Sequence, residues 1–302
     1  MKEINWGFIG CGDVTEIKSG PAFNKVEGSK VVAVMSRTAS KAEDYAKRHN
    51  IPRWYDKAGK LINDPEVNAV YVATPPKFHS ECAIDAMNAG KPVYVEKPMA
   101  ISYKECQKMN EVASRKKVPL FVAYYRRSLP YFLKVKELID KEAIGNIYFI
   151  DLRFWSTARE EDLNSQNPPW RVIPEISGGG YFYDMACHHL DILDYFFGPV
   201  KSASGKSANK GGLYNVEDTV SASIEFESEI IATGSWCFVA EKICKADIIE
   251  ILGSKGKIIF SAFAFKPIVL IVKDIITKYN PVNPANIQFN LIKNVVEELQ
   301  GA

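Results

Sequence analysis

The sequence predicts an α/β protein with two parts: a doubly wound parallel sheet at the N-terminal end, followed by an α/β domain with an open, mostly antiparallel sheet. Three observations support this prediction. In the first third of the chain, short apolar segments alternate with helical patterns. These segments are continuously apolar, which is typical of parallel strands buried on both faces. Farther along, strand-like segments follow one another without helices between them, which indicates antiparallel or mixed pairing.

The first part has the element pattern of a Rossmann dinucleotide-binding domain. We predict strands at residues 4–9, 30–35, 67–73, 92–96 and 118–123, and helices at 39–49, 80–88 and 102–116. The second part begins with a helix and continues with longer strands. We predict helices at 129–141, 183–196 and 286–299, and strands at 147–155, 220–226, 230–239, 246–252 and 257–260. The predicted domains are therefore 1–122 and 123–302.

Composition narrows the range of partners. The chain has 302 residues, of which 47% are hydrophobic and 25% charged, and its formal net charge is +2. This balance is that of an ordinary globular protein and creates no general field that would attract nucleic acid or an acidic membrane. No segment approaches the roughly 20 apolar residues needed to span a bilayer, and the N-terminus has no signal-peptide pattern. We expect a cytoplasmic protein.

The six cysteines indicate neither a disulfide framework nor a metal site. They are scattered and form no CxxC pair, so we expect reduced thiols. One cluster, Cys187-His188-His189, contains three metal-ligand types. Adjacent residues on a helix point about 100° apart, so these three side chains are poorly placed to bind one ion. We predict no metal.

A glycine pattern follows the first predicted strand. Gly10 and Gly12, with Asp13 and Val14 after them, lie where that strand turns into a helix. Glycine allows a tight turn and a close approach of the backbone to a pyrophosphate, and the helix N-terminus beyond it favours phosphate. The third small position holds Thr15, so the fingerprint is incomplete, but its place in a strand–helix–strand unit favours nucleotide binding over a plain turn.

The end of the second strand indicates the kind of nucleotide. An NAD site usually has a carboxylate there for the ribose hydroxyls, whereas this strand is followed by Ser36 and Arg37, with Lys41 one turn later. A hydroxyl and two cations suit a 2′-phosphate. We predict NADP, with NAD the less favoured cofactor; the alternative is that Arg37 and Lys41 are only the solvated start of a helix.

Four motifs, in order, carry a resemblance to a known family. They are the glycine fingerprint, Thr74-Pro75-Pro76-Lys77-Phe78-His79, Glu96-Lys97-Pro98, and Gly178-Gly179-Gly180 followed by Asp184-x-x-x-His188. Their ordered combination resembles the glucose–fructose oxidoreductase / inositol dehydrogenase / MocA (Gfo/Idh/MocA) family over nearly the whole chain. The resemblance implies a Rossmann domain, a second domain whose sheet often forms an oligomer interface, here a homodimer or homotetramer, and sugar, cyclitol or diol substrates. In relatives the last helix is usually followed by a further short segment, so we expect a short C-terminal segment to be missing from this sequence.

Hydride transfer at an alcohol carbon also requires an acid/base group near the oxygen. Asp184 and His188 are four apart on a predicted helix and so share one face, and histidine titrates near neutrality. Lys97 closes the fourth strand at the carboxyl edge of the sheet, where an ammonium can stabilise a developing oxyanion. The resemblance implies that Lys97, Asp184 and His188 are catalytic; a core histidine and a surface lysine are the ordinary alternatives. His189 is expected to be structural.

The remaining candidates concern cofactor contacts and the substrate. Thr74, Pro75, His79 and Glu96 are expected to line or support the cofactor, although His79 could simply begin a helix. Tyr125, Arg126, Trp170 and Arg171 combine aromatic faces with cations, which suits a carbohydrate pocket and equally suits interface packing. We predict an NADP(H)-dependent oxidoreductase that acts on a CH–OH or C=O group of a sugar, cyclitol or cyclic diol. The alternative is a non-catalytic NADP-binding sensor with the same fold.

Overall fold

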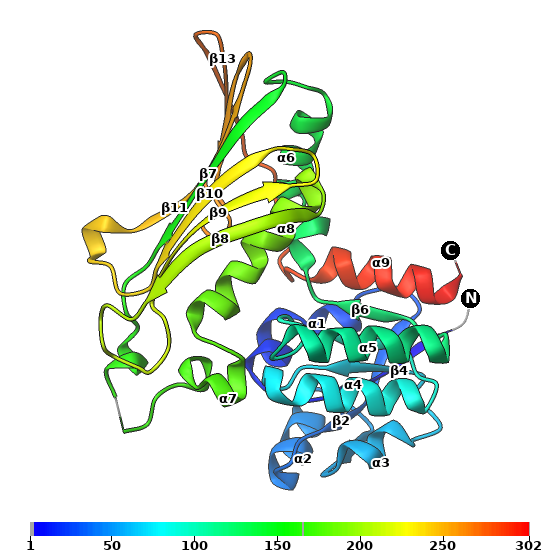
Figure 1. Ribbon diagram of the computed structural model, residues 1–302. Coiled ribbons are helices and arrows are strands. Elements are labelled where there is room, and N and C mark those ends of the chain that lie inside the picture. Colours follow the sequence, from blue (N-terminus) through cyan, green and yellow to red (C-terminus); the bar gives the residue numbers. More distant parts are fainter. Residues whose placement is uncertain (1–2, 165, 302) are drawn as a thin grey trace. The chain divides into compact units, whose positions relative to one another are not determined.

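The computed structural model describes residues 3–164 and 166–301 and divides the chain into two compact units. The first unit comprises Met1–Tyr125 together with Pro284–Ala302, and the second comprises Arg126–Asn283 (Figure 1). The predicted boundary at 122/123 lies close to the observed one. The end of the chain differs from the prediction, because residues 284–302 belong to the first unit.

The first unit is a doubly wound sheet of six parallel strands in the order β3-β2-β1-β4-β5-β6. The strands are β1 (Ile4–Ile9), β2 (Ser29–Met35), β3 (Arg53–Tyr55), β4 (Ala69–Val72), β5 (Val93–Val95) and β6 (Leu120–Val122). The order in which strands are added to the sheet changes direction between β1 and β4. In sheets of this kind, ligands bind at the carboxyl ends of the strands beside this switch point. The glycine loop follows β1 directly, so it lies at the expected place for a nucleotide.

Helices cover both faces of this sheet. The longer ones are α2 (Ala39–Arg48), α4 (His79–Asn88), α5 (Tyr103–Lys116) and α9 (Phe289–Gln300), with the short α1 (Gly20–Phe23) and α3 (Ala58–Ile62). One core cluster joins alternate strand residues, including Trp6 and Tyr71, to side chains of α1, α2 and α9. The other cluster joins the intervening strand residues, including Val70, to α3, α4 and α5. This arrangement explains why the strand segments are apolar at every position.

The last helix belongs to the first unit because of its apolar stripe. Ile292, Val295 and Val296 of α9 are buried in the same cluster as Trp6 and Phe23. The sequence pattern correctly indicated a helix, but an amphipathic stripe does not specify which of two cores it covers.

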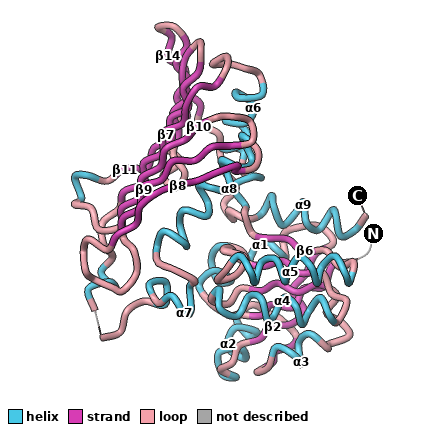
Figure 2. Tube along the Cα trace, in the orientation of Figure 1, coloured by secondary structure: helices cyan, strands magenta, loops and turns pink. Residues whose placement is uncertain are grey.

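The second unit is built on an eight-stranded sheet in the order β14-β13-β12-β11-β7-β10-β9-β8 (Figure 2). Its strands are β7 (Ile147–Trp155), β8 (Val200–Ala208), β9 (Thr219–Phe226), β10 (Ile231–Cys237), β11 (Ala246–Gly253), β12 (Gly256–Phe260), β13 (Ile268–Val272) and β14 (Ile275–Tyr279). Among the strands described, β10 and β7 pair in parallel and the other neighbours pair antiparallel. The predicted open, mostly antiparallel sheet is confirmed.

Two helices, α6 (Pro130–Asp140) and α8 (Cys187–Phe197), lie along one face of that sheet (Figure 1). Phe196 of α8 and Phe132 of α6 both pack on Phe260 of β12, and Phe197 packs on Phe226 of β9. In β7 the buried residues alternate with half-buried ones, as expected for a sheet with one covered face.

Several elements were not predicted from the sequence. They are the strands β3, β8, β13 and β14 and the helices α3 and α7 (Pro174–Ser177), besides short 3-10 turns. Strand β8 has polar residues on both faces and is exposed along nearly its whole length, so it lacks the alternation that marks a half-buried strand. Within the described residues, no helix is long and apolar enough to cross a membrane.

Candidate cofactor and active site

The glycine loop is shaped by close contact with the neighbouring strand ends. Gly10 has φ +118°, and a Cβ there would lie 2.6 Å from the carbonyl oxygen of Ala73. A Cβ on Gly12 would meet no protein atom within 4 Å. Gly10 is therefore required by the protein itself, whereas a bare backbone at Gly12 leaves space that a bound ligand can use. In the part of the chain described, the backbone N–H groups of Cys11 and Gly12 have no protein acceptor, which suits them to phosphate oxygens.

The helix expected after this loop is replaced by a π-helical turn, η1 (Val14–Lys18), followed by the short α1. Gly20 and Pro21 explain the break, since proline has no N–H and disfavours a preceding helical turn. Thr15, at the third position of the fingerprint, is fully buried, and its hydroxyl donates to the carbonyl of Gly12 at 2.8 Å. The departure from glycine is thus accommodated by an internal hydrogen bond.

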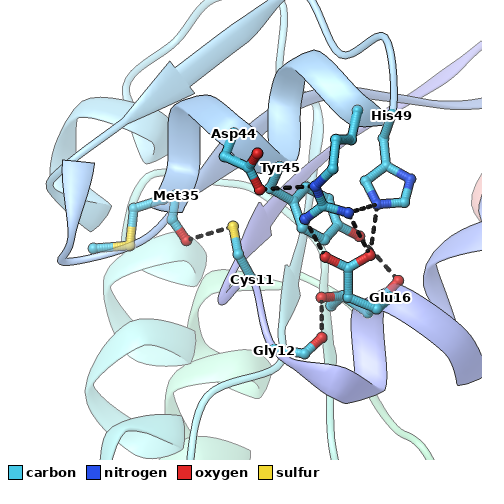
Figure 3. A network of polar contacts seen from close by, with 9 residues as sticks. Cys11, Gly12, Glu16, Met35, Asp44, Tyr45 and His49 are labelled. Carbon is cyan, nitrogen blue, oxygen red and sulfur yellow. Dashed lines mark hydrogen bonds and ion pairs between the residues drawn. The ribbon is translucent and has the colours of Figure 1, made fainter. Parts of the chain in front are cut away.

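A carboxylate that the sequence analysis did not select ties this turn to α2 (Figure 3). Glu16 accepts hydrogen bonds from Arg48 Nη1 at 3.0 Å, and its Oε2 lies 2.8 Å from His49 Nε2. The bond from Arg48 is the main cause that lowers the pKa of Glu16 to about 2. Arg48 also pairs with Asp44 at 2.7 Å. Because both carboxylates are engaged with Arg48, they do not replace the ribose-binding carboxylate that β2 lacks.

Cys11, between the two glycines, anchors the loop to the end of β2. Its thiol lies 3.5 Å from the carbonyl oxygen of Met35, to which it donates. Burial raises the pKa of Cys11 to about 12, against an opposing effect of the nearby Lys41 ammonium. The thiol is therefore a structural donor rather than a nucleophile, and Lys41 is close enough to the loop for its charge to act on it.

The three residues predicted to select NADP lie just beyond β2. The hydroxyl of Ser36 accepts from the backbone N–H of Thr38 at 3.3 Å. The guanidinium of Arg37 lies over the ring of Phe78, 4.7 Å from its centroid, in the short turn η2 (Pro76–Phe78) that follows β4. Arg37 and Lys41 are both exposed. Stacking on Phe78 holds the guanidinium of Arg37 beside the 74–78 loop while leaving its donors accessible.

The loops after β4 and β5 are joined by His79. Its ring nitrogens lie 2.7 Å from the carbonyl oxygen of Thr74 and 2.9 Å from that of Pro98. The ring is 1% exposed, and burial lowers the pKa of His79 to about 4. A neutral imidazole can donate to only one of these carbonyls, so the ring links the two loops with one strong hydrogen bond and one close contact. His79 is therefore a buried residue that holds together the two loops of the site.

Thr74 has a feature that fits a cofactor. Its hydroxyl oxygen is buried, and within the described residues it has no hydrogen-bond partner. Buried hydroxyls are nearly always hydrogen-bonded, so this one is suited to a ligand group at the switch point. Together with the open position at Gly12, it shows that the residues present fit a dinucleotide.

Glu96 and Lys97 end β5. Glu96 is buried and accepts hydrogen bonds from Tyr71 and Gln288, while Lys97 is half-buried and is joined to Pro98 by a cis peptide bond. Tyr125, a predicted substrate residue, begins the turn η3 (Tyr125–Ser128) at the boundary of the first unit.

In the second unit, three predicted residues are brought together. The guanidinium of Arg171 lies over the ring of Trp170, 4.5 Å from its centroid, and Arg171 Nε lies 3.4 Å from Oδ2 of Asp184. Trp170 and Arg171 come from the turn η5 (Trp170–Val172), and Asp184 from a π-helical turn, η6 (Phe182–Ala186). The result is an aromatic face, a cation and a carboxylate in one place.

The predicted helix at 183–196 is divided into η6 and α8. Asp184 therefore lies in the π-helical turn and His188 in the α-helix. These two kinds of helix place the residues of one face at different spacings along the sequence. His188 is 4% exposed, and its ring packs edge-on against Phe263 at 5.7 Å. Asp247 accepts from the backbone N–H groups of Phe263 and both its neighbours, which fixes the position of Phe263.

His189 and Arg126 are core residues of this unit. His189 is 1% exposed and accepts a bond from Trp236 Nε1 at 3.4 Å, and burial lowers its pKa to about 3. Arg126 is 2% exposed, donates to the carbonyl of Ala262 at 3.0 Å, and stacks on Phe263 at 4.3 Å. Arg126, which was predicted to bind substrate, makes these two contacts within the core of the second unit.

The glycines before Asp184 allow a close approach of another loop. Gly178 has φ +88°, and a Cβ on Gly180 would lie 2.7 Å from Val216. The loop that carries Val216 is held by Asp218, which is fully buried and accepts from the N–H groups of Lys210 and Gly211. Phe263, Asp247 and Asp218 were not identified from the sequence, because isolated residues of these types carry no motif.

Comparison with known proteins agrees with this architecture. Residues 4–124 match the model described as "Oxidoreductase family, NAD-binding Rossmann fold", and residues 132–259 match the "GFO/IDH/MocA C-terminal domain". The fold and these matches define an NAD(P)-dependent oxidoreductase, a dehydrogenase or reductase. The chain belongs to the Gfo/Idh/MocA family.

Individual relatives cover nearly the whole chain. A Formosa agariphila protein named oxidoreductase P35 is 40% identical over 97% of this chain and 90% of its own length. The trans-1,2-dihydrobenzene-1,2-diol dehydrogenase of Danio rerio is 27% identical over 96% of this chain and 84% of its own. Among solved structures, an oxidoreductase from Thermotoga maritima has a TM-score of 0.87 at 25% identity, covering 100% of this chain and 90% of that one. A levoglucosan dehydrogenase in complex with NADH and L-sorbose has a TM-score of 0.84 at 22% identity, with 98% and 88% covered, and supports the fold.

Proposed function

We propose that this protein is an NADP(H)-dependent oxidoreductase that transfers a hydride between the nicotinamide and a CH–OH or C=O carbon of a sugar, a cyclitol or a cyclic diol. The observation that carries the proposal is the dinucleotide site: Gly12 is open to a ligand, and the buried hydroxyl of Thr74 lacks a partner within the described chain. Gly10, Asp13, Val14, Pro75, His79 and Glu96 form or support the same site.

The preference for NADP over NAD rests on charge. Ser36, Arg37 and Lys41 provide a hydroxyl and two exposed cations where NAD-binding domains usually carry a carboxylate. A guanidinium can form two parallel hydrogen bonds to a phosphate, and the stacking of Arg37 on Phe78 reduces the conformational freedom that would be lost on binding.

For the chemical step we assign catalytic roles to Lys97, Asp184 and His188. When bound, the nicotinamide supplies or takes up the hydride. In reduction, the carbonyl oxygen gains negative charge, which the Lys97 ammonium stabilises by hydrogen bonding, and a proton passes to that oxygen from Lys97 or His188. In oxidation the same groups accept the hydroxyl proton. Asp184, paired with Arg171, holds a fixed negative charge that can orient substrate hydroxyls.

Trp170 and Arg171 are the better supported substrate residues. An aromatic face covered on one side by a guanidinium and next to a carboxylate suits the apolar face and the hydroxyls of a polyol ring. Tyr125 and Arg126 are further proposed substrate residues, of which Arg126 packs on Phe263. The names of relatives point to the same substrate class: dihydrodiol dehydrogenase, D-xylose dehydrogenase and 1,5-anhydro-D-fructose reductase.

We further propose a homodimer or homotetramer formed through the open face of the second sheet. On that face Phe149 of β7 lies between Ile231 of β10 and Leu252 of β11 in register, and Ile231 and Leu252 are 48% and 37% exposed. Contiguous apolar side chains on an open sheet face are typical of a subunit interface. Among the described residues, no cysteine is joined in a disulfide, which fits the proposed cytoplasmic location.

The proposal is tested by following absorbance at 340 nm with NADPH or NADP⁺ and a panel of keto-sugars, aldoses, inositols and cyclic diols. We expect turnover with at least one polyol or its keto form, and a higher kcat/KM with NADP(H) than with NAD(H). Tight NADPH binding without turnover of any panel member would instead support the sensor function.

A further inference from the structure

A buried hydrogen bond joins two segments of the second unit that carry proposed site residues. The hydroxyl of Tyr181 donates to Oδ1 of Asp162 at 2.6 Å, and these residues are 1% and 2% exposed. The same hydroxyl lies 3.4 Å from Oε1 of Glu161, which is the longer of its two contacts. Asp162 belongs to the turn η4 (Glu160–Leu163), and Tyr181 directly precedes η6.

Both carboxyl oxygens of Asp162 act as acceptors. Oδ2 accepts from the backbone N–H of Arg159 at 2.7 Å, while Oδ1 accepts from Tyr181. Burial of a carboxylate is costly unless donors of this kind compensate for the lost water. Loss of the Tyr181 hydroxyl would leave a buried oxygen of Asp162 without its hydrogen bond, which disfavours the present arrangement of the two segments.

The ring of Tyr181 is fixed from several sides. The guanidinium of Arg159 lies over it, 4.2 Å from its centroid, and the rings of Tyr214 and Phe238 both lie 5.8 Å away, centroid to centroid. Burial raises the pKa of Tyr181 above its ordinary value, and the hydrogen bond to Asp162 adds to this effect. The hydroxyl therefore remains a donor at any working pH.

Tyr181 is linked to Asp184 through the backbone. The carbonyl oxygen of Gly180, whose carbon forms the peptide bond with Tyr181, accepts from the backbone N–H of Asp184 at 3.2 Å. Asp184 Oδ2 lies 3.4 Å from Nε of Arg171. The segment that contains Asp162 and Arg171 is therefore joined to the following segment at two places, by a hydrogen bond and by an ion pair.

We propose that Tyr181 and Asp162 are positioning residues for the polyol pocket: their buried hydrogen bond holds the turn η6 where Asp184 pairs with Arg171. The inference rests on the proposed function, in which Asp184 orients substrate hydroxyls. Residues that contact a substrate keep their geometry when buried hydrogen bonds behind them fix the backbone, and this pair supplies such a bond.

The variants Tyr181→Phe and Tyr214→Phe form a matched pair. Tyr181→Phe keeps the ring and removes only the hydroxyl that donates to Asp162. Tyr214→Phe makes the same change in the same aromatic cluster, but the buried hydroxyl of Tyr214 has no hydrogen-bond partner within the described residues. We expect Tyr181→Phe to raise KM for a polyol of the panel about 10-fold, because the substrate loses a hydrogen bond to the charged Asp184. The dissociation constant of NADPH should stay within about 3-fold of wild type, and Tyr214→Phe should change neither constant by more than about 3-fold.

A readout that needs no substrate separates this inference from the proposed function. The rate at which phenylglyoxal modifies Arg171 is followed by peptide mass spectrometry, with the exposed Arg115 of α5 as internal reference. The side chain of Arg171 is 32% exposed, so the reagent can reach it. Pairing with Asp184 favours the protonated guanidinium, which is the unreactive form. We expect the rate at Arg171, relative to Arg115, to rise at least about 3-fold in Tyr181→Phe and to stay at the wild-type value in Tyr214→Phe.

Asp162→Asn tests the same hydrogen bond from the acceptor side. Asparagine has one side-chain oxygen, which can accept from Tyr181 or from the N–H of Arg159 but does not replace both carboxylate oxygens. We expect a rate of Arg171 modification between those of wild type and Tyr181→Phe.

The outcomes distinguish the two proposals. If wild type turns over no panel member but the differences in Arg171 modification occur, the proposed function fails and the positioning role stands. Equal rates of Arg171 modification in Tyr181→Phe and Tyr214→Phe, or an equal rise of KM in both variants, would overturn the positioning role while leaving the proposed function in place.

Discussion

Replacing Arg37 by aspartate should reverse the cofactor preference. The Arg37 guanidinium is exposed, so its ion pair with a 2′-phosphate would lie near solvent, and the lower end of the range for charged hydrogen bonds, about 1.5 kcal/mol, applies. The new carboxylate adds repulsion of about 1 kcal/mol at contact distance in water. The sum of about 2.5 kcal/mol corresponds to roughly 70-fold weaker NADPH binding.

Binding is measured by the fluorescence of NADPH and NADH, and kcat/KM is measured with both. Lys47→Asp is the matched control, because it makes the same charge change on an exposed residue in the last turn of α2. We expect Arg37→Asp to weaken NADPH binding while NADH binding stays equal or tightens, and Lys47→Asp to change neither by more than about 3-fold, because exposed charges that do not contact the ligand are screened. An unchanged NADPH-to-NADH ratio in Arg37→Asp would refute the assignment of Arg37 to the 2′-phosphate.

Three further changes test other parts of the site. Gly12→Val fills space that no protein atom occupies, so cofactor binding should fall at least about 10-fold with little change in melting temperature; a normal dissociation constant would exclude close ligand approach at Gly12. Glu16→Gln weakens the link to Arg48 and His49. Because the pKa of Glu16 is lowered to about 2, the stability that this carboxylate contributes to the wild type is present above pH 4.5 and is lost as pH falls towards 2. Urea titrations of the variant should therefore lack this part of the acid dependence of the free energy of unfolding. His189 is neutral in the folded protein, with a pKa of about 3 against 6.5 for a free ring, so the free energy of unfolding declines as pH falls from 6.5 towards 3. His189→Phe should reduce this decline by a few kcal/mol. An unchanged dependence of the free energy of unfolding on pH would contradict the burial of a neutral ring.

Much of the first unit could be predicted from the sequence because its signals are local. Continuous apolar strands, the glycines of residues 10–12 and the strand-to-loop position of Lys97 each depend on a few neighbouring residues. The strands without a pattern of buried residues could not be predicted in this way. For example, β8 pairs with β9 through backbone hydrogen bonds while its side chains are exposed to solvent, so its sequence shows no alternation of buried and exposed residues.

The site residues likewise include some that the sequence could indicate and some that it could not. Trp170 and Arg171 were selected as substrate residues and Asp184 as a catalytic residue, and the structure shows Arg171 in contact with both of the others. The partners of Glu96 were beyond reach of sequence reasoning, because Tyr71 reads as an ordinary strand residue and Gln288 lies in a segment whose apolar stripe indicates a helix but no function. The division of the helix at 182–197 depends on hydrogen-bond register, which side-chain periodicity does not encode.

The central claim, that a hydride moves between the nicotinamide and a polyol carbon with Lys97 and His188 serving its oxygen, is tested most directly by isotope transfer. The protein is incubated with a substrate identified from the panel and NADPH carrying deuterium at the transferable position, and the product is examined by NMR. The account predicts deuterium at the carbinol carbon for wild type. It predicts rates at least about 100-fold lower for Lys97→Ala and His188→Ala, with NADPH still bound. Product without deuterium, or full transfer rates in both variants, would contradict it.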